Sequence, residues 1–316
     1  MSQHTIWHSG MAADGSTRTL RDAVYGEAVG DALGVPFEFR ARDTFTCTGM
    51  AWDRANGNIG VGGGVGAWRQ PVGTWSDDTG MALATCDSLR ESGRVDIAGM
   101  RNKFLLWRDS RDYNVDTRFD IGSTTAEALA RGHGLSGERD NGNGSLMRIV
   151  PLAFTDASDD EIRAVSGITH AHLMSCEACV TYVRYARLLR DGASPLEALD
   201  DERVAHGLSG VASSTTAGVQ VDDLTIIPKL DRADVASGGF VVDTLVAAIW
   251  CLTDTTRYSD CVLEAVNLGE DTDTTAAVAG GLAGIVYGMD AIPDEWLHLL
   301  RGKDVIDRCI NLREDN

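Results

Sequence analysis

The chain has 316 residues, of which 43% are hydrophobic, enough for a sizeable core in one large domain or in two. Its 28 Lys and Arg residues stand against 47 Asp and Glu residues, which gives a formal net charge of −19. This charge argues against a surface that binds nucleic acid or an anionic membrane, and it is compatible with cation binding.

The N-terminus and the cysteines favour a cytoplasmic location. Residues 1–19 contain no apolar run like that of a signal peptide, and the longest apolar stretch, 276–286, is too short to span a bilayer. The 7 cysteines are odd in number and scattered through helical patterns, which indicates reduced thiols. Cys176 and Cys179 form a CxxC motif without a second pair for zinc, so we interpret them as small buried residues near a helix start.

In chain order, we expect a flexible tail over residues 1–17 and then one compact domain over 18–312. Apolar residues recur at four-residue spacing from Leu20 to Ala32, which predicts an amphipathic helix over 18–33. A glycine and a proline end this helix, because neither residue continues a helix easily.

Beyond this helix, glycine-rich loops alternate with helical patterns. A long loop covers residues 40–75, and loops of this length are usually functional. A second glycine-rich loop follows residue 131. No alternating strand pattern persists, so the predicted fold class is all-α. Helices are predicted over 79–91, 96–108, 123–131, 159–167, 174–190, 195–202, 240–253, 257–266, 274–288 and 294–311, whereas residues 203–238 indicate only a short helix and loops.

Two short acidic motifs lie where a loop becomes a helix. They read T-W-S-D-D-T-G at 74–80 and G-E-D-T-D-T-T at 269–275. Both can be ordinary caps, because Ser, Thr and Asp satisfy the unpaired N–H groups and the partial positive charge of a helix start. Paired acids also suit a site for hard cations built from oxygen ligands. If the four aspartates of the two motifs converge, each close pair repels by about 4 kcal/mol, which cations or protons must offset.

The helix predicted after the second motif has one face with almost no side chains. Ala276, Gly280, Gly284 and Gly288 fall at four-residue intervals on this face. Each glycine weakens a helix by roughly 1 kcal/mol relative to alanine, so we expect another helix to approach closely here. The helix should therefore be central, with the carboxylates at its start deep in the domain.

Seven short motifs follow one another along the chain. They are G-D-A-L-G at 30–34 with Glu38, W-S-D-D-T at 75–79, D-I-G-S-T-T at 120–125, G-N-G-S-L-M-R at 142–148, T-H at 169–170, G-F-V-V-D-T at 239–244 and G-E-D-T-D-T at 269–274. Together, and in this order, they resemble the ADP-ribosylglycohydrolase family over roughly residues 18–300. The resemblance implies an all-α hydrolase domain with two divalent cations, Mg²⁺ or Mn²⁺, held at helix N-termini.

The same resemblance implies a role for each acidic motif. Glu38 matches the acid that the family places beside the metals, as a ligand or through water, and Ser76 stands where many members have Thr. Attack at the anomeric carbon passes through an oxocarbenium-like state, which nearby carboxylates stabilise. The implied metal ligands are Ser76, Asp77, Asp78, Asp271, Asp273 and Thr274, and the implied catalytic acids are Asp120, Glu38, Asp78 and Asp273.

Asp120 points to the linkage that is cleaved. Family members that act on arginine carry a D-I-G-x-T-T segment beside the active site, and a carboxylate pairs with a guanidinium through two hydrogen bonds. Asp120 can also be a cap for a helix that starts at Ile121, and the two roles are compatible. The resemblance thus favours ADP-ribosylarginine over ADP-ribosylserine or O-acetyl-ADP-ribose.

The remaining implied contacts are with ADP-ribose. The turn Gly142, Asn143, Gly144 and Ser145 offers backbone N–H groups to the diphosphate, and Met147 follows in the same motif. His170 matches a histidine that contacts ADP-ribose, although an isolated histidine here also suits a core or cap position, as does His172. Phe240 stands where an aromatic ring stacks on the adenine, or else belongs to the core. Asp243 caps or orients its loop.

We therefore expect a metal-dependent hydrolase that releases ADP-ribose from arginine in ADP-ribosylated proteins. Its partners would be the ADP-ribosylated protein and ADP-ribose. Two alternatives are a hydrolase of serine-linked or O-acetyl-ADP-ribose and an immunity-type protein that also binds an ADP-ribosylating toxin. A purely structural role is disfavoured because every acidic ligand position is filled.

Overall fold

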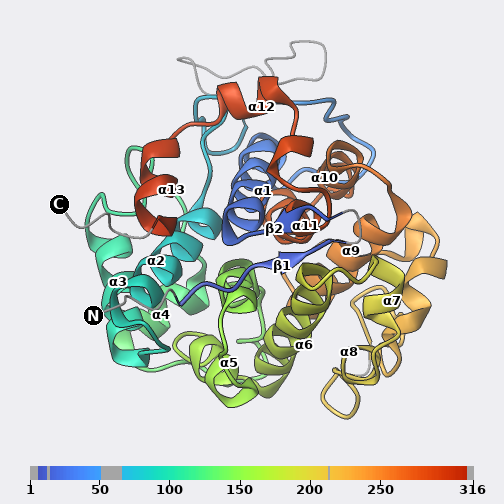
Figure 1. Ribbon diagram of the computed structural model, residues 1–316, viewed down its shortest axis with the longest axis horizontal. Helices are drawn as coiled ribbons and strands as arrows, with labels where there is room; N and C mark the ends of the chain where they lie inside the picture. The colour runs from blue at the N-terminus through green and yellow to red at the C-terminus, as the bar shows by residue number, and fades with distance from the viewer. Residues whose placement is uncertain (1–5, 13–14, 51–65, 213, 312–316) are drawn as a thin grey trace.

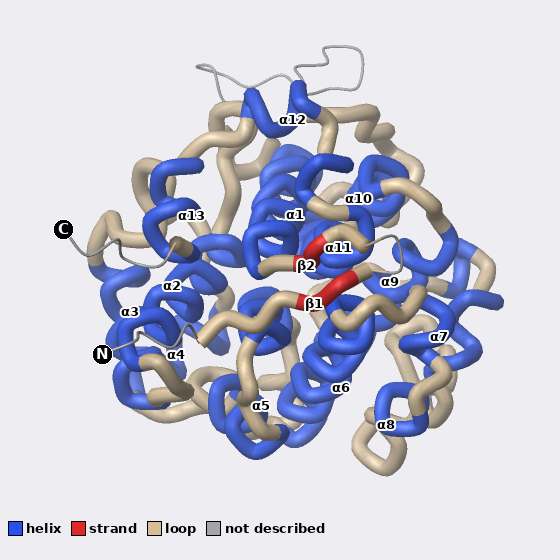
Figure 2. Tube along the Cα trace, in the orientation of Figure 1, coloured by secondary structure: helices blue, strands red, loops and turns tan. Residues whose placement is uncertain are grey.

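A computed structural model describes residues 6–12, 15–50, 66–212 and 214–311. Helices and turns make up nearly all of this part of the chain, and the strands are a single short pair (Figure 2). The all-α prediction is confirmed. The strands are β1 (Gly10–Met11) and β2 (Thr17–Arg18), and the α-helices are α1 (Leu20–Gly34), α2 (Asp77–Ser92), α3 (Ile97–Asp109), α4 (Ser123–Arg131), α5 (Asp159–Ser166), α6 (Leu173–Arg190), α7 (Pro195–Leu199), α8 (Glu202–Ala205), α9 (Val241–Asp254), α10 (Tyr258–Asn267), α11 (Thr272–Tyr287), α12 (Asp294–Leu299) and α13 (Lys303–Ile310).

Helices α1 and α11 lie in the middle of the molecule, with α2, α3 and α13 on one side and α6, α7 and α9 on the other (Figure 1). The two central helices run antiparallel and touch through their main chains. A Cβ atom on Gly26 would lie 2.3 Å from the carbonyl oxygen of Gly280, and one on Gly30 would lie 2.0 Å from that of Ala276. The close neighbour predicted from the small-residue face is therefore α1, which carries glycines of its own.

The contact between α1 and α11 ends beside the second acidic motif. A Cβ atom on Gly34 would lie 2.4 Å from the Cα atom of Asp273. At the other end, Gly288 follows the last residue of α11 with a φ of 80° and ends the helix, so it does not belong to the contact face.

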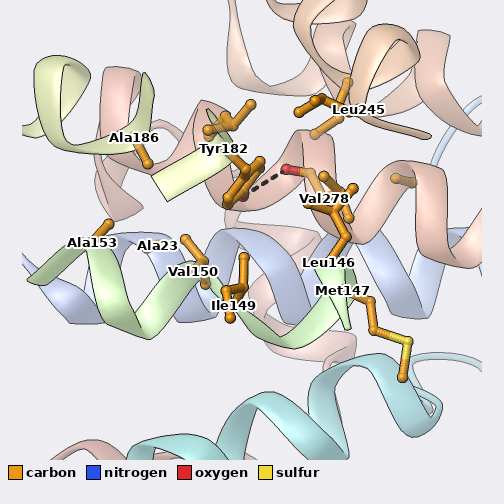
Figure 3. Close-up of a cluster of buried hydrophobic side chains, with 14 of the residues drawn as sticks. Ala23, Leu146, Met147, Ile149, Val150, Ala153, Tyr182, Ala186, Leu245 and Val278 are labelled. Atoms are coloured by element: carbon orange, nitrogen blue, oxygen red, sulfur yellow. Dashed lines mark hydrogen bonds between the residues drawn. The ribbon is translucent and has the colours of Figure 1, made fainter. Parts of the chain in front are cut away.

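A hydrophobic cluster fills the space between the central helices and α6 and α9. Tyr182 of α6 is buried there and donates a hydrogen bond of 3.1 Å to the carbonyl oxygen of Val278 in α11. Leu146, Ile149 and Val150 pack beside this pair (Figure 3). Leu146 and Val150 come from two 3₁₀ helices and Ile149 from the residue between them, where the sequence predicts no helix. The 3₁₀ helices of the described residues are Val35–Phe37, Leu146–Arg148, Val150–Phe154, Leu224–Lys229, Arg232–Asp234 and Met289–Ala291.

The segment before α1 differs from the predicted loose tail wherever the structure describes it. β1 pairs antiparallel with β2, and the backbone N–H of His8 donates to the carbonyl oxygen of Phe154 at 2.8 Å. Ile6 and Trp7 pack against the core. Two apolar side chains and a few backbone hydrogen bonds thus attach this segment to the core. This pattern is too short to be recognised in the sequence. Residues 1–5 and 13–14 lie outside the described residues.

The predicted helix over 294–311 is wrong, because two helices occupy this range. Gly302 separates α12 from α13 and adopts a φ of 66°, which interrupts a right-handed helix. A Cβ atom on Gly302 would lie 3.0 Å from the indole of Trp75. The predicted helix over 195–202 likewise divides, into α7 and α8, and the loop over 40–75 lies partly outside the described residues.

The cysteines and the helix lengths bear on two further predictions. All 7 cysteines are buried and free. The thiols of Cys176 and Cys179 contact His170 O and Ser145 Oγ, which confirms that the CxxC motif is packed in the interior. Among the described residues, no helix is both long and apolar enough to cross a membrane.

Candidate active site

The start of α2 is organised by Asp31, a fully buried residue in the last turn of α1. Its carboxylate accepts the backbone N–H groups of Ser76 and Thr79 at 2.9–3.0 Å, and the hydroxyl of Thr79 at 2.6 Å. Asp31 thereby satisfies donors that begin α2. The carboxylates of Asp77 and Asp78 are consequently not needed as caps and are available to the site.

Five carboxylates converge beside this helix start. Asp31, Asp78 and Asp273 form one group, and Glu38, Asp271 and Asp273 form a second. Within each group the carboxylate oxygens lie within 4.8 Å of one another. Thr274 connects the two helix starts by donating from Oγ1 to Asp78 Oδ1 at 3.2 Å. The two acidic motifs therefore meet, as the metal-site interpretation requires.

The cap interpretation holds for only one of the two motifs. Ser76 caps α2, since its hydroxyl accepts the N–H of Asp78. Asp271 occupies the corresponding position before α11 but makes no side-chain cap bond. Instead, Asp271 Oδ2 accepts a hydrogen bond of 2.8 Å from Asn143 Nδ2.

The electrostatics of the cluster suit cations. Burial raises the pKa values of Asp77, Asp78 and Asp273 well above the usual range, and neighbouring carboxylates raise them further. Burial also raises the pKa of Glu38 to about 8 and that of Asp31 to about 6. A group of acids in this state binds either protons or metal ions.

The donor set fits hard divalent cations. Asp78 Oδ2 is buried and has no hydrogen-bond partner among the described residues. The carboxyl groups of Asp77 and Asp120 lie close enough to influence each other's pKa, as do those of Glu38 and Asp273, and such close pairs favour a shared proton or a cation. All of these ligand atoms are oxygens, the preference of Mg²⁺ and Mn²⁺. The buried acidic clusters can therefore hold metal ions.

A pocket of about 280 Å³ opens over this cluster. Its acidic wall is made by Glu38, Asp77, Asp120 and Asp271, with Thr274 beside them. The glycine-rich turn and His170 also line the pocket, and further lining comes from Phe39, Gly122, Ser123, Thr124, Thr125, Gly142, Asn143, Gly144, Met147 and Gly239.

His170 faces this pocket as a neutral hydrogen-bond donor. Thr169 Oγ1 accepts a hydrogen bond from Arg148 Nη2 at 2.9 Å and lies 2.8 Å from His170 Nδ1. When Thr169 donates its hydroxyl hydrogen to Nδ1, the ring proton resides on Nε2. Burial, together with the charge of Arg148, lowers the pKa of His170 to about 3, so the ring stays uncharged. This is a pocket position rather than a core position.

These features agree with comparisons to known proteins. The model of the ADP-ribosylglycohydrolase family matches residues 14–315 of this chain. The chain belongs to the ADP-ribosylglycohydrolase family.

Two curated relatives and one solved structure support the assignment. ADP-ribosylarginine hydrolase Tri1 of Pseudomonas putida (strain GB-1) is 33% identical over 88% of this chain and 72% of its own length. ADP-ribosyl-[dinitrogen reductase] glycohydrolase of Rhodospirillum rubrum is 32% identical over 93% of each chain. A solved structure described as an ADP-ribosylglycohydrolase-related protein complex is 28% identical, with a TM-score of 0.68 over 92% of this chain and 94% of that one.

Within this glycohydrolase, the glycine-rich turn serves the site less uniformly than the sequence predicts. Gly144 must be glycine, because a Cβ atom there would lie 2.7 Å from His170 Cε1. The backbone N–H of Asn143 is not available to a phosphate, since it donates to the carbonyl oxygen of Gly239 at 3.1 Å. The side chain of Ser145 is fully buried, accepts a hydrogen bond from Ser166 and does not line the pocket.

Two other predicted residues lie close to the pocket without being among its lining residues. Phe240 is half-buried at the N-cap of α9, and its backbone bridges to Gly142. Its stacking on adenine stays a prediction. Asp243 lies in the first turn of α9 and holds the separate loop around Thr216 by accepting hydrogen bonds from the backbone N–H and the hydroxyl of that residue. His172 caps α6 through Met174, as the alternative interpretation has it.

Asp120 does not cap the following helix. α4 begins at Ser123, its N-cap is Gly122, and no side chain makes a cap bond there. The carboxyl of Asp120 instead contacts that of Asp77. The cap interpretation is thus wrong for α4, and a place in the pocket remains for Asp120.

Three residues were missed by the sequence interpretation. Asp31 and Arg148 stand in two of the motifs but had no predicted role. A signal existed for Asp31, because an acid inside an otherwise apolar helix needs dedicated partners, whereas the burial of Arg148 becomes visible only in the structure. Trp68 carried no signal of its own. It donates its indole N–H to Glu38 from a distant loop position.

Proposed function

We propose that this chain hydrolyses the N-glycosidic bond of ADP-ribosylated arginine in proteins, with two divalent cations, Mg²⁺ or Mn²⁺, in the acidic cluster. One observation carries the arginine assignment: Asp120 lines the pocket together with the metal-site acid Asp77. A carboxylate beside the metal-binding acids can accept two hydrogen bonds from a guanidinium. The two relatives described above, one of them named for ADP-ribosylarginine, support the same substrate.

The residues that would hold the cations come from both helix starts. Asp31 and Glu38 lie within reach of the same oxygens and complete the set. When bound, the cations would supply Lewis acidity to the ribose hydroxyls and to water. The ligands would be Ser76, Asp77, Asp78, Asp271, Asp273 and Thr274.

The side chains around the pocket divide the remaining work. His170 donates from Nε2 to an oxygen of ADP-ribose, and Gly144 lets that part of the substrate approach the backbone. The acidic wall stabilises the positive charge that develops at the anomeric carbon. Asp120 orients the guanidinium and assists the proton that the leaving nitrogen must gain.

The test is release of ADP-ribose from a peptide that carries one ADP-ribosylarginine. We expect turnover with Mg²⁺ or Mn²⁺ and none after removal of the cations by a chelator, with activity restored when they are returned. A matched peptide with ADP-ribosylserine, and O-acetyl-ADP-ribose, are the comparison substrates. Faster turnover of either one would overturn the arginine assignment, and full activity in the chelator would overturn the cation requirement.

A further inference from the structure

Three aromatic residues form a group beside the mouth of the pocket, and the proposed reaction gives them no role. We call Phe39, Trp68 and Phe119 the aromatic rim. The Trp68 ring lies 6.0 Å from that of Phe39, at an interplanar angle of 58°, and 5.7 Å from that of Phe119, at 52°. Phe39 itself lines the pocket and is 64% exposed, the second highest exposure among the large hydrophobic residues of the described chain.

The backbone holds Phe39 in this exposed place at a cost. Its φ is 66°, in the left-handed region that residues other than glycine rarely occupy. Two hydrogen bonds fix this conformation, because Phe39 N–H donates to Glu270 O and Glu270 N–H donates to Arg40 O, each at 2.8 Å. Glu270 immediately precedes the acid Asp271, so the ring is tied to the metal-binding wall. Strain of this kind persists where surrounding structure enforces it, often at functional sites.

The rim is joined to two of the acids that line the pocket. Phe39 follows Glu38 in the chain, Phe119 precedes Asp120, and Trp68 donates its indole N–H to Glu38. Each of these two acids thus has a ring of the rim next to it in the chain. Two arginines that adjoin the rim in the chain place their guanidinium groups over other rings, Arg40 over Phe37 and Phe45 and Arg118 over Trp107.

We infer that the aromatic rim binds the guanidinium group of the modified arginine and selects it over leaving groups without a planar cation. This inference rests on the proposed function. A guanidinium is planar, weakly hydrated and able to stack on aromatic faces while its edge pairs with carboxylates. Apolar exposure alone would not choose a ligand, but rings flanked by Glu38 and Asp120 match a flat cation in both shape and charge.

The experiment replaces Phe39 and measures two substrates and one ligand. Phe39→Tyr keeps a ring, Phe39→Leu keeps apolar area without one, and Phe39→Ala removes both. All three face the same backbone strain as the parent, and the position is exposed, so folding is matched. Leu196→Ala, at a residue of α7 that is 54% exposed, is the control for losing an exposed apolar side chain.

We expect kcat/KM for the ADP-ribosylarginine peptide to fall about 3- to 30-fold in Phe39→Leu and Phe39→Ala, the range of a cation–π contact. Phe39→Tyr should retain more of this activity than Phe39→Leu, because it keeps a ring, and Leu196→Ala should match the parent. Binding of free ADP-ribose should be equal in all variants. Inhibition by N-acetylarginine amide should weaken in parallel with turnover, whereas the lysine analogue should inhibit poorly throughout.

The outcomes separate the two levels of the proposal. If the parent hydrolyses ADP-ribosylarginine and Phe39→Leu equals it, the rim assignment is overturned and the proposed function stands. If Phe39→Leu is normal and only Phe39→Ala loses activity, the rim provides apolar contact alone, which also overturns guanidinium selection. A parent without activity on ADP-ribosylarginine would overturn the proposed function and the rim assignment with it.

Discussion

Asn143 and Asp271 join the substrate turn to the acidic cluster: Asn143 Nδ2 donates to Asp271 Oδ2 across 2.8 Å. The same amide also donates to Thr244 Oγ1 at 2.9 Å, so one side chain spans three segments of the chain. Asp271 is among the implied metal ligands, and its orientation thus depends on a residue of the glycine-rich turn.

Asn143→Ala should weaken the binding of Mn²⁺ and of ADP-ribose together. Loss of a hydrogen bond to a metal ligand typically costs 10–100-fold in metal affinity. Titration calorimetry of each ligand measures both effects. Asn141→Ala is the control, because the Asn141 amide contacts only the sulfur of Met174 among the described residues. Unchanged Mn²⁺ affinity in Asn143→Ala would show that Asp271 does not need this support.

Removal of the cations should make stability depend strongly on pH. Without metal, the folded state holds protons on its buried acids, since the pKa is about 6 for Asp31 and about 8 for Glu38. Unfolded carboxyls titrate near pH 4, as an approximate value, so between these limits the folded state binds more protons than the unfolded one. The stabilisation is complete at low pH and is lost as the pH rises through 6 to 8.

We therefore expect the melting temperature of chelator-treated protein to fall from pH 5 to pH 8. Mg²⁺ should raise it most at pH 8, where deprotonated acids bind the cation, and Mn²⁺ titration should reach two ions per chain. A melting temperature that is equal with and without Mg²⁺ across this range, together with no ion retained at high metal, would contradict the metal site.

Asp120→Asn should reduce turnover of ADP-ribosylarginine far more than binding of free ADP-ribose. The substitution keeps the size of the side chain and removes only its charge. Free ADP-ribose has no guanidinium, so its binding should not depend on that charge. A positioned acid–base group contributes typically 10²–10⁴-fold to a rate. Glu138→Gln, at an exposed residue, is the control for losing one negative charge. Equal turnover in Asp120→Asn and the parent, at equal metal content, would remove the main support for arginine.

Phe240→Ala should weaken ADP-ribose binding by about 1–2 kcal/mol, the magnitude of an aromatic stacking contact. The cations should stay bound, because Phe240 is the N-cap residue of α9 and is not among the implied metal ligands. Titration calorimetry with ADP-ribose measures the loss. An unchanged affinity would show that Phe240 serves the core, against which its partly buried side chain packs.

Local sequence patterns predicted the structural features that depend on residues close together in the chain. The apolar spacing from Leu20 to Ala32 gave helix α1, and the small-residue face of α11 correctly required a close partner. Which helix that partner is, and where each helix begins, depends on contacts between distant residues. Asp31 moves the start of α2 to Asp77 by capping it from 46 positions earlier in the chain (77 − 31 = 46).

The same distinction separates the site residues that were predicted from those that were missed. Motif positions placed Glu38, Asp120 and His170 at one pocket, and the structure brings them together there. The hydrogen-bond partners of His170 depend on Arg148 and Thr169, and no spacing rule relates a buried guanidinium to a histidine ring. The aromatic rim is still harder to predict from the sequence, since Trp68 reaches Glu38 only after the chain has folded.

The main-chain contact between α1 and α11 fixes the distance between the two halves of the cation site. Where Gly26 meets Gly280 and Gly30 meets Ala276, the gap between the helices is set by main-chain atoms rather than by side chains that can be exchanged. The acids that the two helices carry, Asp31 and Asp273, are therefore held at a spacing that repacking elsewhere in the interior does not alter. Surface and substrate loops can diverge freely around such a pair, while one added methyl group at Gly26 or Gly280 would force the two halves of the cation site apart.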